Sequence, residues 1–298
     1  ISACLVGSEM CIRDSIHTKQ ERRMVEVIII GEKINGAIPS VREAIAKKNA
    51  DLIRQRAIAQ TGAGAHYIDC APSTAPSLEY DTMVWLIDLI QEVTDTPVSI
   101  DSPDAKLLAR IIGEERLKKP GMVNSVNEEG DKCETIFPLI AGTEWNVLGL
   151  TCDKEGIPAQ ADKKLDIAKR IIDKAVKYGV ALDHLHIDPC VMALSTMPSS
   201  MKDFEQCIVG IHEYAPEVKV TGAISNISYE MPARKYINAN CMAYAIRAGL
   251  DSAIMDPCNV DMMSTIYACE ALCMFDKGGR KYNRAYRKGL IGKTKIGG

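Results

Sequence analysis

Short apolar runs alternate with longer amphipathic runs eight times along this chain, and no other feature limits its possible folds as strongly. Each apolar run has the length of one strand and contains few polar residues, which is typical of strands buried on both faces. Strand followed by helix, repeated eight times, predicts a parallel sheet with helices packed against its outer face. The predicted strands are Val25–Ile30, His66–Asp69, Val98–Asp101, Met122–Ser125, Val147–Leu150, Leu185–Asp188, Val218–Ile224 and Ala253–Asp256.

The amphipathic runs between these strands carry apolar residues at the spacing of an α-helix. Gly179 and Gly249 stand where two of the helices are expected to end. Eight strand–helix units in 298 residues predict an α/β protein of one domain, a (β/α)8 TIM barrel. The clearest predicted helices are Ser77–Val93, Leu165–Val176, Asn238–Gly249 and Asn259–Phe275.

The two ends of the chain differ from the predicted barrel between them. Residues 1–23 have no helical or strand periodicity and lack the order of a signal peptide, and their run CLVGSEMCIRDS resembles a translated sequencing-adapter fragment. We therefore expect a non-native or disordered extension over 1–23, a start at Met24 and a barrel over 24–276. Residues 277–298 contain eight Lys or Arg and no Asp or Glu, which predicts a basic tail in a solvated terminal helix.

Charge and composition exclude some classes of partner. Residues 24–276 hold 24 basic and 36 acidic residues, a net charge of −12, which does not suit binding to nucleic acid. The clearest apolar run, Val25–Ile30, is far shorter than the ~18 residues that a membrane helix needs, so no membrane span is expected. The 11 cysteines include no Cys-x-x-Cys pair, and free thiols in a cytoplasmic protein are the simplest interpretation.

Polar residues stand at the C-terminal ends of the predicted strands, where the active site of such a barrel lies. Ionised carboxylates accept hydrogen bonds and amides both donate and accept, so this set suits a neutral, flat heterocycle with several N–H groups, such as a pterin. It suits a phosphate poorly, because the loops after the last two strands are not glycine-rich. Any single Asp of the set could instead cap a helix or form a turn. The residues are Glu32, Asp69, Asp101, Asn124, Asn127, Asp188, Asn226 and Asp256.

Six short motifs, in order along the chain, carry a resemblance to a known family. Together they resemble the methyltetrahydrofolate:corrinoid methyltransferases, which are pterin-binding TIM barrels related to dihydropteroate synthase and to the folate domain of cobalamin-dependent methionine synthase. The resemblance runs from about Val27 to Phe275. The motifs are Gly31–Gly36, Ile100–Ser102, Val123–Asn127, Gly149–Thr151 with Gly156–Pro158, Ile187–Pro189 and Ser225–Ser228.

The resemblance implies roles for the strand-end residues. By analogy, Asp101, Asn124 and Asp188 bind the pterin ring, and Asn226 lies near its N5 atom. The implied reaction moves a methyl group between N5 of tetrahydrofolate and the cobalt of a corrinoid, with Asn226 and Asp188 as the catalytic residues. A separate corrinoid protein would carry the cobalamin and dock transiently at the barrel mouth, and we expect a homodimer. We expect no metal ligands, and the motifs leave the direction of transfer open.

Two departures from the family pattern and two other functions remain open. Cys70 and Ala71 replace a Leu-Asn pair common in the family, and Tyr229 replaces a Gln, which leaves the methyl donor uncertain. One alternative is a metal-dependent aldolase or lyase that uses the strand-end carboxylates with Mg²⁺. The other is a pterin-binding protein without catalytic activity. At the level of a single residue, Asn226 could merely cap the helix after the seventh strand.

Overall fold

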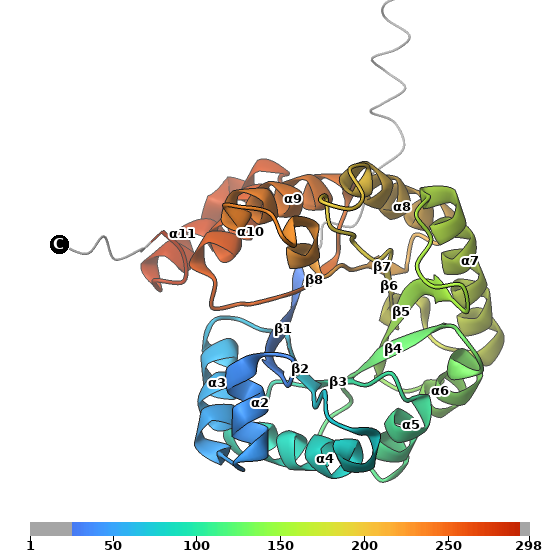
Figure 1. Ribbon diagram of the computed structural model, residues 1–298. Helices are drawn as coiled ribbons and strands as arrows, with labels where there is room; N and C mark the ends of the chain where they lie inside the picture. Colours follow the sequence, from blue (N-terminus) through green and yellow to red (C-terminus); the bar gives the residue numbers. More distant parts are fainter. Residues whose placement is uncertain (1–25, 293–298) are drawn as a thin grey trace, which may run out of the picture.

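The computed structural model describes residues 26–292 and shows eight parallel strands surrounded by helices (Figure 1). Hydrogen-bonded neighbours follow the order β7-β6-β5-β4-β3-β2-β1-β8. This architecture confirms the predicted single-domain (β/α)8 barrel. The strands are β1 (Ile28–Asn35), β2 (Tyr67–Ala71), β3 (Val98–Asp101), β4 (Met122–Glu128), β5 (Asn146–Asp153), β6 (Leu185–Asp188), β7 (Lys219–Val220) and β8 (Ser252–Met255).

Main-chain bonds between the β7 and β8 segments complete the ring. Ala223 forms an isolated parallel bridge with Ile254. The amide of Asp251 donates to the carbonyl of Val220 over 3.0 Å, and that of Ile254 donates to Gly222 over 3.1 Å. These bonds satisfy the edge of β8, which would otherwise present unpaired backbone groups.

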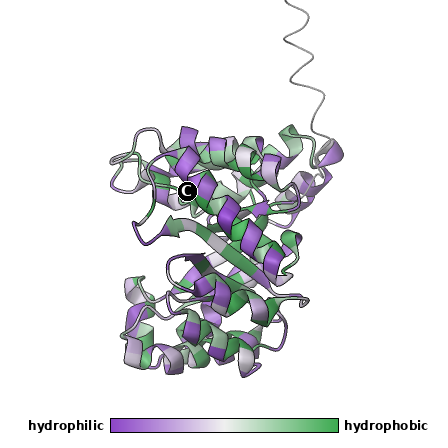
Figure 2. Cartoon of the chain, turned by 90° about the vertical axis from the view of Figure 1, so that its right-hand side faces the viewer, coloured by the Kyte–Doolittle hydropathy of each residue, from purple (hydrophilic) through white to green (hydrophobic). Residues whose placement is uncertain are grey.

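The helices alternate with the strands and lie outside the barrel, with hydrophobic and hydrophilic residues alternating along them (Figure 2). Gly179 and Gly249 end α7 and α9 in the left-handed conformation, at φ 80° and 113°, as predicted. Within residues 26–292 no helix is long and apolar enough to cross a membrane. The helices are α2 (Pro39–Ala46), α3 (Ala50–Gly62), α4 (Pro76–Val93), α5 (Ala105–Gly113), α6 (Lys132–Ile140), α7 (Ala161–Tyr178), α8 (Ser200–Tyr214), α9 (Arg234–Ala248), α10 (Val260–Leu272) and α11 (Arg280–Arg287), with the short 3-10 segments η1 (Leu182–His184), η2 (Ile224–Ser228) and η3 (Lys277–Gly279).

The strands separate an apolar layer outside the barrel from a mixed interior. Outward residues such as Ile68, Ile100 and Ile187 belong to the large core shared with the helices. Inside the barrel, a small apolar cluster near the N-terminal ends of the strands contains Ile30, Met122 and Leu148, packed against Tyr67 and Ile254. Because side chains alternate between the faces of a strand, the inward positions beyond this cluster lead to the polar end of the barrel.

Two predicted strands need correction. The predicted strand Val218–Ile224 is wrong as a continuous strand, because only Lys219–Val220 pair as β7 before the chain turns into η2. Its apolar residue Ile224 is buried but lies in the 3-10 segment, so the apolar run indicated burial and not extension. The first strand continues past Ile30 to Asn35, with a register shift between Gly31 and Ile34, and Val25 lies outside the described residues.

The described ends of the chain pack against the barrel. η3 and α11 follow α10, and Ala285 and Ile291 are buried, with 3% and 1% of their surface exposed. Lys281 of α11 pairs over 2.9 Å with Glu26, which lies two residues before β1 begins. The basic segment is thus partly packed through its apolar residues. The predicted extension over 1–23 and the start at Met24 lie outside the described residues.

Candidate active site at the barrel mouth

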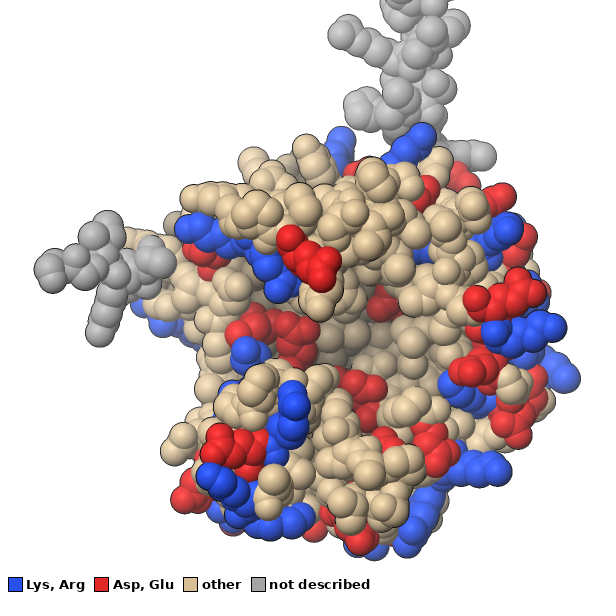
Figure 3. Space-filling view, in the orientation of Figure 1, with Lys and Arg blue, Asp and Glu red and all other residues tan. Residues whose placement is uncertain are grey.

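The end of the barrel seen in Figure 3 is hollowed at its centre, and acidic side chains gather at the edge of the hollow. Two neighbouring pairs of strand residues carry polar side chains into the barrel. Asp69 of β2 stands in register with Ser99 of β3, and Asp101 of β3 stands in register with Asn124 of β4. Since adjacent parallel strands lie about 4.8 Å apart, these side chains are brought into direct reach of one another.

Asp69 is the centre of a buried hydrogen-bond group. Its Oδ1 accepts from Ser99 Oγ over 2.7 Å and from Asn124 Nδ2 over 3.2 Å. All three residues are buried, with Asp69 only 3% exposed. Because the Nδ2 group of Asn124 is held by Asp69, its carbonyl oxygen is left to accept from a ligand.

Asp101 shares this group and carries a strongly shifted pKa. Burial, the charge of Asp69 and their mutual hydrogen bond raise the pKa of Asp101 to about 8. Burial also raises the pKa of Asp69, although hydrogen bonds from Ser99 and Asn124 oppose the rise. Two carboxyl groups this close cannot both ionise easily, so the pair holds a proton at neutral pH. Asp101 is therefore the protonated partner and donates to Asp69.

Asp188 lies alone at the end of β6 and is 4% exposed. Its Oδ1 accepts the backbone N–H of Cys190 over 2.7 Å, and the backbone of Ala223 also donates to it. Burial raises the pKa of Asp188 to about 6, against the opposing effect of these donors and of Lys164. At neutral pH the carboxylate is ionised in a buried place, which is the state that accepts N–H groups most strongly.

Asn226 lies in η2, and its backbone N–H donates over 3.1 Å to the carbonyl of Ala223, the residue whose own backbone N–H donates to Asp188. Asn226 is exposed, and within residues 26–292 its side chain has no hydrogen-bond partner. The alternative that Asn226 caps the next helix is wrong. The residue before α9 is Ala233, and α9 has no side-chain cap.

The other predicted residues occupy the rim or make local contacts. Burial first, and then the charge of Asp256, raise the pKa of Glu32. Asp256 itself pairs with Lys33 over 3.2 Å. Asn127 uses both ends of its amide within the chain: its Oδ1 accepts from the N–H of Glu129, and its Nδ2 lies 3.2 Å from Cys152 Sγ.

Sequence reasoning missed several residues that support the site. Ser99 alternates with the apolar residues Val98 and Ile100 of β3. This alternation could have predicted that the Ser99 side chain faces the inside of the barrel. Glu79, in the first turn of α4, is buried and accepts from Ser102 Oγ over 2.7 Å, but a glutamate there reads as an ordinary surface residue. Lys164 of α7 is 2% exposed, and no spacing rule marks it.

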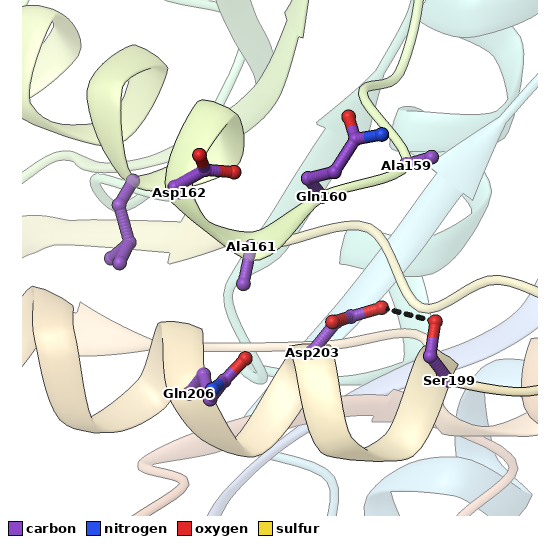
Figure 4. A pocket seen from close by; sticks show the side chains of 8 residues that line it. Ala159, Gln160, Ala161, Asp162, Ser199, Asp203 and Gln206 are labelled. Carbon is purple, nitrogen blue, oxygen red and sulfur yellow. Dashed lines mark hydrogen bonds between the residues drawn. The ribbon is translucent and has the colours of Figure 1, made fainter.

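A separate pocket of about 490 Å³ lies between the starts of α7 and α8 (Figure 4). Gln160 and Asp162 line one side, and Ser199, which donates to Asp203 over 2.7 Å, lines the other. None of the predicted site residues lines this pocket, and its walls offer no buried charge to fix a ligand. Across the described part of the chain, no three His, Cys, Asp or Glu side chains are grouped to hold a metal ion.

Comparison with known proteins gives the family. The family described as pterin binding enzyme matches residues 32–256. The chain is 46% identical over 268 residues to the methylcorrinoid:tetrahydrofolate methyltransferase of Eubacterium limosum, covering 89% of this chain and 98% of the relative. It is 31% identical over 253 residues to the methionine synthase of Mycobacterium tuberculosis, but it spans only 21% of that protein's length.

Solved structures agree on the fold at low sequence identity. A dihydropteroate synthetase structure superimposes with a TM-score of 0.63 at 15% identity, covering 85% of this chain and 96% of the other. The dihydropteroate synthase of Yersinia pestis gives 0.62 at 15% identity, covering 84% and 94%. The extent of the family match and the identity to the Eubacterium limosum enzyme show that this chain belongs to the pterin-binding enzymes, in the family of that methyltransferase.

Proposed function

We propose that this protein transfers a methyl group from a methylated corrinoid, carried by a separate protein, to N5 of tetrahydrofolate. The similar Eubacterium limosum enzyme, matched over 98% of its length, is named for this direction, which the sequence motifs left open. Two observations support the proposal: Asp188 is buried and ionised at the end of β6, and the side chain of Asn226 in η2 is exposed and has no hydrogen-bond partner among the described residues. Asp188 can hold the pterin ring while the amide of Asn226 contacts the reacting N5 atom.

Binding of the pterin ring falls to Asp188, Asn124 and Asp101. The amino group and ring N–H of a pterin are donors, so they pair with the ionised carboxylate of Asp188. The side-chain oxygen of Asn124, Oδ1, accepts a further N–H group of the pterin, and Asp101 presents a carboxyl oxygen beside it. Asp69 acts behind them by holding Asn124 and Asp101 in place.

Three more predicted residues complete the proposed binding set. Glu32 and Asp256 form the acidic rim on the β1 and β8 side. Asn127 borders the site from β4, and its amide is already engaged by Cys152 and Glu129. We therefore assign Asn127 a packing contact with the bound pterin. We assign Glu32 and Asp256 an electrostatic role, because their carboxyl groups make the potential over the mouth more negative.

The chemistry requires a positive charge to be stabilised at N5. The N5 lone pair forms a bond to the methyl carbon, the electron pair of the broken carbon–cobalt bond stays on cobalt, and N5 loses its proton to water. The Oδ1 atom of Asn226 accepts a hydrogen bond from the N5–H group while positive charge develops there. Asp188 holds the ring so that N5 faces Asn226, and the acidic rim favours the same charge.

A direct assay tests this function. The protein, methylcobalamin and tetrahydrofolate are mixed without oxygen, and loss of the methylcobalamin spectrum is followed while chromatography detects methyltetrahydrofolate. We expect both changes to depend on the protein, and the reverse reaction to occur from methyltetrahydrofolate and reduced cobalamin. Binding of tetrahydrofolate with no methyl transfer in either direction, to free or protein-bound corrinoid, would support a pterin-binding protein without this activity.

Assembly and location are part of the proposal. Leu272 and Met274, at the end of α10, are 82% and 68% exposed, and a second copy of the chain would cover such apolar side chains in a homodimer. Sedimentation equilibrium measures the mass directly. The described cysteines are free, which supports a reducing, cytoplasmic location, and the corrinoid protein would dock transiently over the mouth.

A further inference from the structure

Lys164 is among the largest fully buried side chains of the described chain, with 2% of its surface exposed. It lies on the face of α7 that packs against the barrel, together with Ile167, Ala168 and Ile171. Lysine is rarely buried this completely, because its ammonium group loses its hydration unless a partner compensates. A buried lysine on an apolar helix face therefore requires a group that compensates its charge.

The turn after β6 supplies that group. Lys164 Nζ donates to the backbone carbonyl of Cys190 over 2.8 Å. The backbone N–H of Cys190 in turn donates to Asp188 Oδ1 over 2.7 Å. Within residues 26–292, Lys164 has no direct ion pair. Cys190 has a φ of 56°, in the left-handed region that residues other than glycine seldom adopt. The lysine thus holds a strained turn whose N–H group points at Asp188.

We propose that Lys164 is a positioning residue that keeps Asp188 ionised and its turn closed, so that Asp188 can accept the N–H groups of a pterin at neutral pH. This inference rests on the proposed function, because it assigns the purpose of Asp188 to pterin binding. Lys164 itself touches neither substrate nor the reacting atoms in this arrangement.

The groups that face Asp188 leave Lys164 as the main opposing charge. Burial raises the pKa of Asp188 to about 6, and the backbone N–H groups of Cys190 and Ala223 together with Lys164 oppose this rise. Burial raises the pKa of the Cys190 and Cys152 thiols, so both are uncharged at neutral pH. On the same strand, burial lowers the pKa of His186 to about 3, which leaves it neutral as well, and Lys219 of β7 acts on His186.

The sign of the effect follows from these groups. Without the charge of Lys164, burial dominates, and the pKa of Asp188 rises above about 6. A protonated Asp188 carries an O–H donor where one of the two ligand N–H groups would donate, so its affinity for a pterin falls. In Lys164→Met this fall therefore begins at a higher pH than in the wild type. The loss is reversible, because raising the pH ionises the carboxyl group again.

The experiment compares Lys164→Met and Lys164→Arg with Lys163→Met, which removes an exposed charge from the neighbouring position. The dissociation constant for tetrahydrofolate is measured from pH 5 to 9. The pKa of Asp188 in the ligand-free protein is measured separately by carbon NMR of side-chain carboxyl groups, assigned with Asp188→Asn. In Lys164→Met we expect both midpoints to move up by about one pH unit or more, with binding at least about threefold weaker at pH 6.5 and near wild type at pH 8.5. Lys164→Arg and Lys163→Met should retain the wild-type profile.

Other outcomes overturn the inference in distinguishable ways. An unchanged pKa for Asp188 in Lys164→Met, or binding weakened equally at every pH, would leave Lys164 as a structural residue only. If Lys164→Met does not fold, Lys164→Gln keeps a donor without the charge, and the same shift is required of it. Failure of the wild-type protein to bind tetrahydrofolate at any pH contradicts the proposed function, while the NMR titration still decides what Lys164 does to Asp188.

Discussion

The two sides of the barrel mouth differ in how their buried carboxyl groups are protonated. On the β2–β4 side, Asp69 and Asp101 lie together and share a proton, supported by Ser99 and Asn124. On the β6–η2 side, Asp188 is single and remains ionised at neutral pH beside backbone donors. Aspartates on different strands of one barrel thus differ in protonation because their neighbours differ. In the proposed function, the first side holds the pterin ring and the second presents a charge to it.

Removing the amide of the β6–η2 side should produce the largest effect. Asn226→Ala is expected to lower the rate constant of single-turnover methyl transfer by about 10² or more, because the amide acts on charge that develops only in the transition state. The affinity for tetrahydrofolate should change much less. Since Asn226 caps no helix and its side chain bonds to no described residue, the melting temperature should hardly change. A wild-type rate in this variant would remove Asn226 from the mechanism.

A pair of substitutions compares how the two sides bind the ring. Asp188→Asn should weaken tetrahydrofolate binding by about 1.5–3 kcal/mol, because an ionised acceptor is lost. Asn124→Ala should cost about 0.5–1.5 kcal/mol, the usual worth of a neutral hydrogen bond. Calorimetric titration of both variants at pH 8 measures the difference. Equal losses would show that the charge of Asp188 has no special part in binding, and no loss in either variant would misplace the pterin site.

The shared proton of the β2–β4 side predicts a dependence of stability on pH. The pKa of Asp101 is about 8 in the folded protein and near 4 in an unfolded chain, so the folded state binds more protons between these values. Its contribution to stability therefore falls as pH rises from about 4 to 8. Asp101→Asn keeps a donor to Asp69 without an ionisable group. Relative to wild type, it should gain about 1–3 kcal/mol in the free energy of unfolding between pH 5 and pH 8.

Urea unfolding of both proteins at the two pH values measures this gain. Asp104→Asn, which alters an exposed helix cap next to the same strand, is the matched control and should show no comparable gain. A difference between Asp101→Asn and wild type that stays constant with pH would contradict the shared proton.

The smallest effect is expected from the N-terminal segment. A chain that begins at Met24 should melt within about 2 °C of the full chain, because residues 1–23 lack the apolar periodicity that packs a helix or strand. Tetrahydrofolate binding on both sides of the mouth should be unchanged. A large fall in melting temperature would show that this segment packs on the barrel, and our prediction for it would be wrong.

The regular parts of the barrel could be predicted closely. Val98–Asp101 and Leu185–Asp188 are strands with the predicted bounds, because each is a short apolar run that must be buried on both faces. The seventh strand could not be predicted this way. Its apolar run continues into η2, and a pattern of burial does not distinguish a strand from a buried 3-10 turn.

The candidate site divides in the same manner. Local sequence determined that Asp69, Asp101, Asn124 and Asp188 lie on strands: Asp101 and Asp188 end β3 and β6, whereas Asp69 and Asn124 lie within β2 and β4, which continue past their predicted ends. Only the tertiary structure decided their chemistry. Strand register brought Asp101 against Asp69, and the packing of α7 brought a buried lysine to the turn beside Asp188. Protonation depends on burial and on neighbours distant in the chain, and no local pattern in a sequence carries that information.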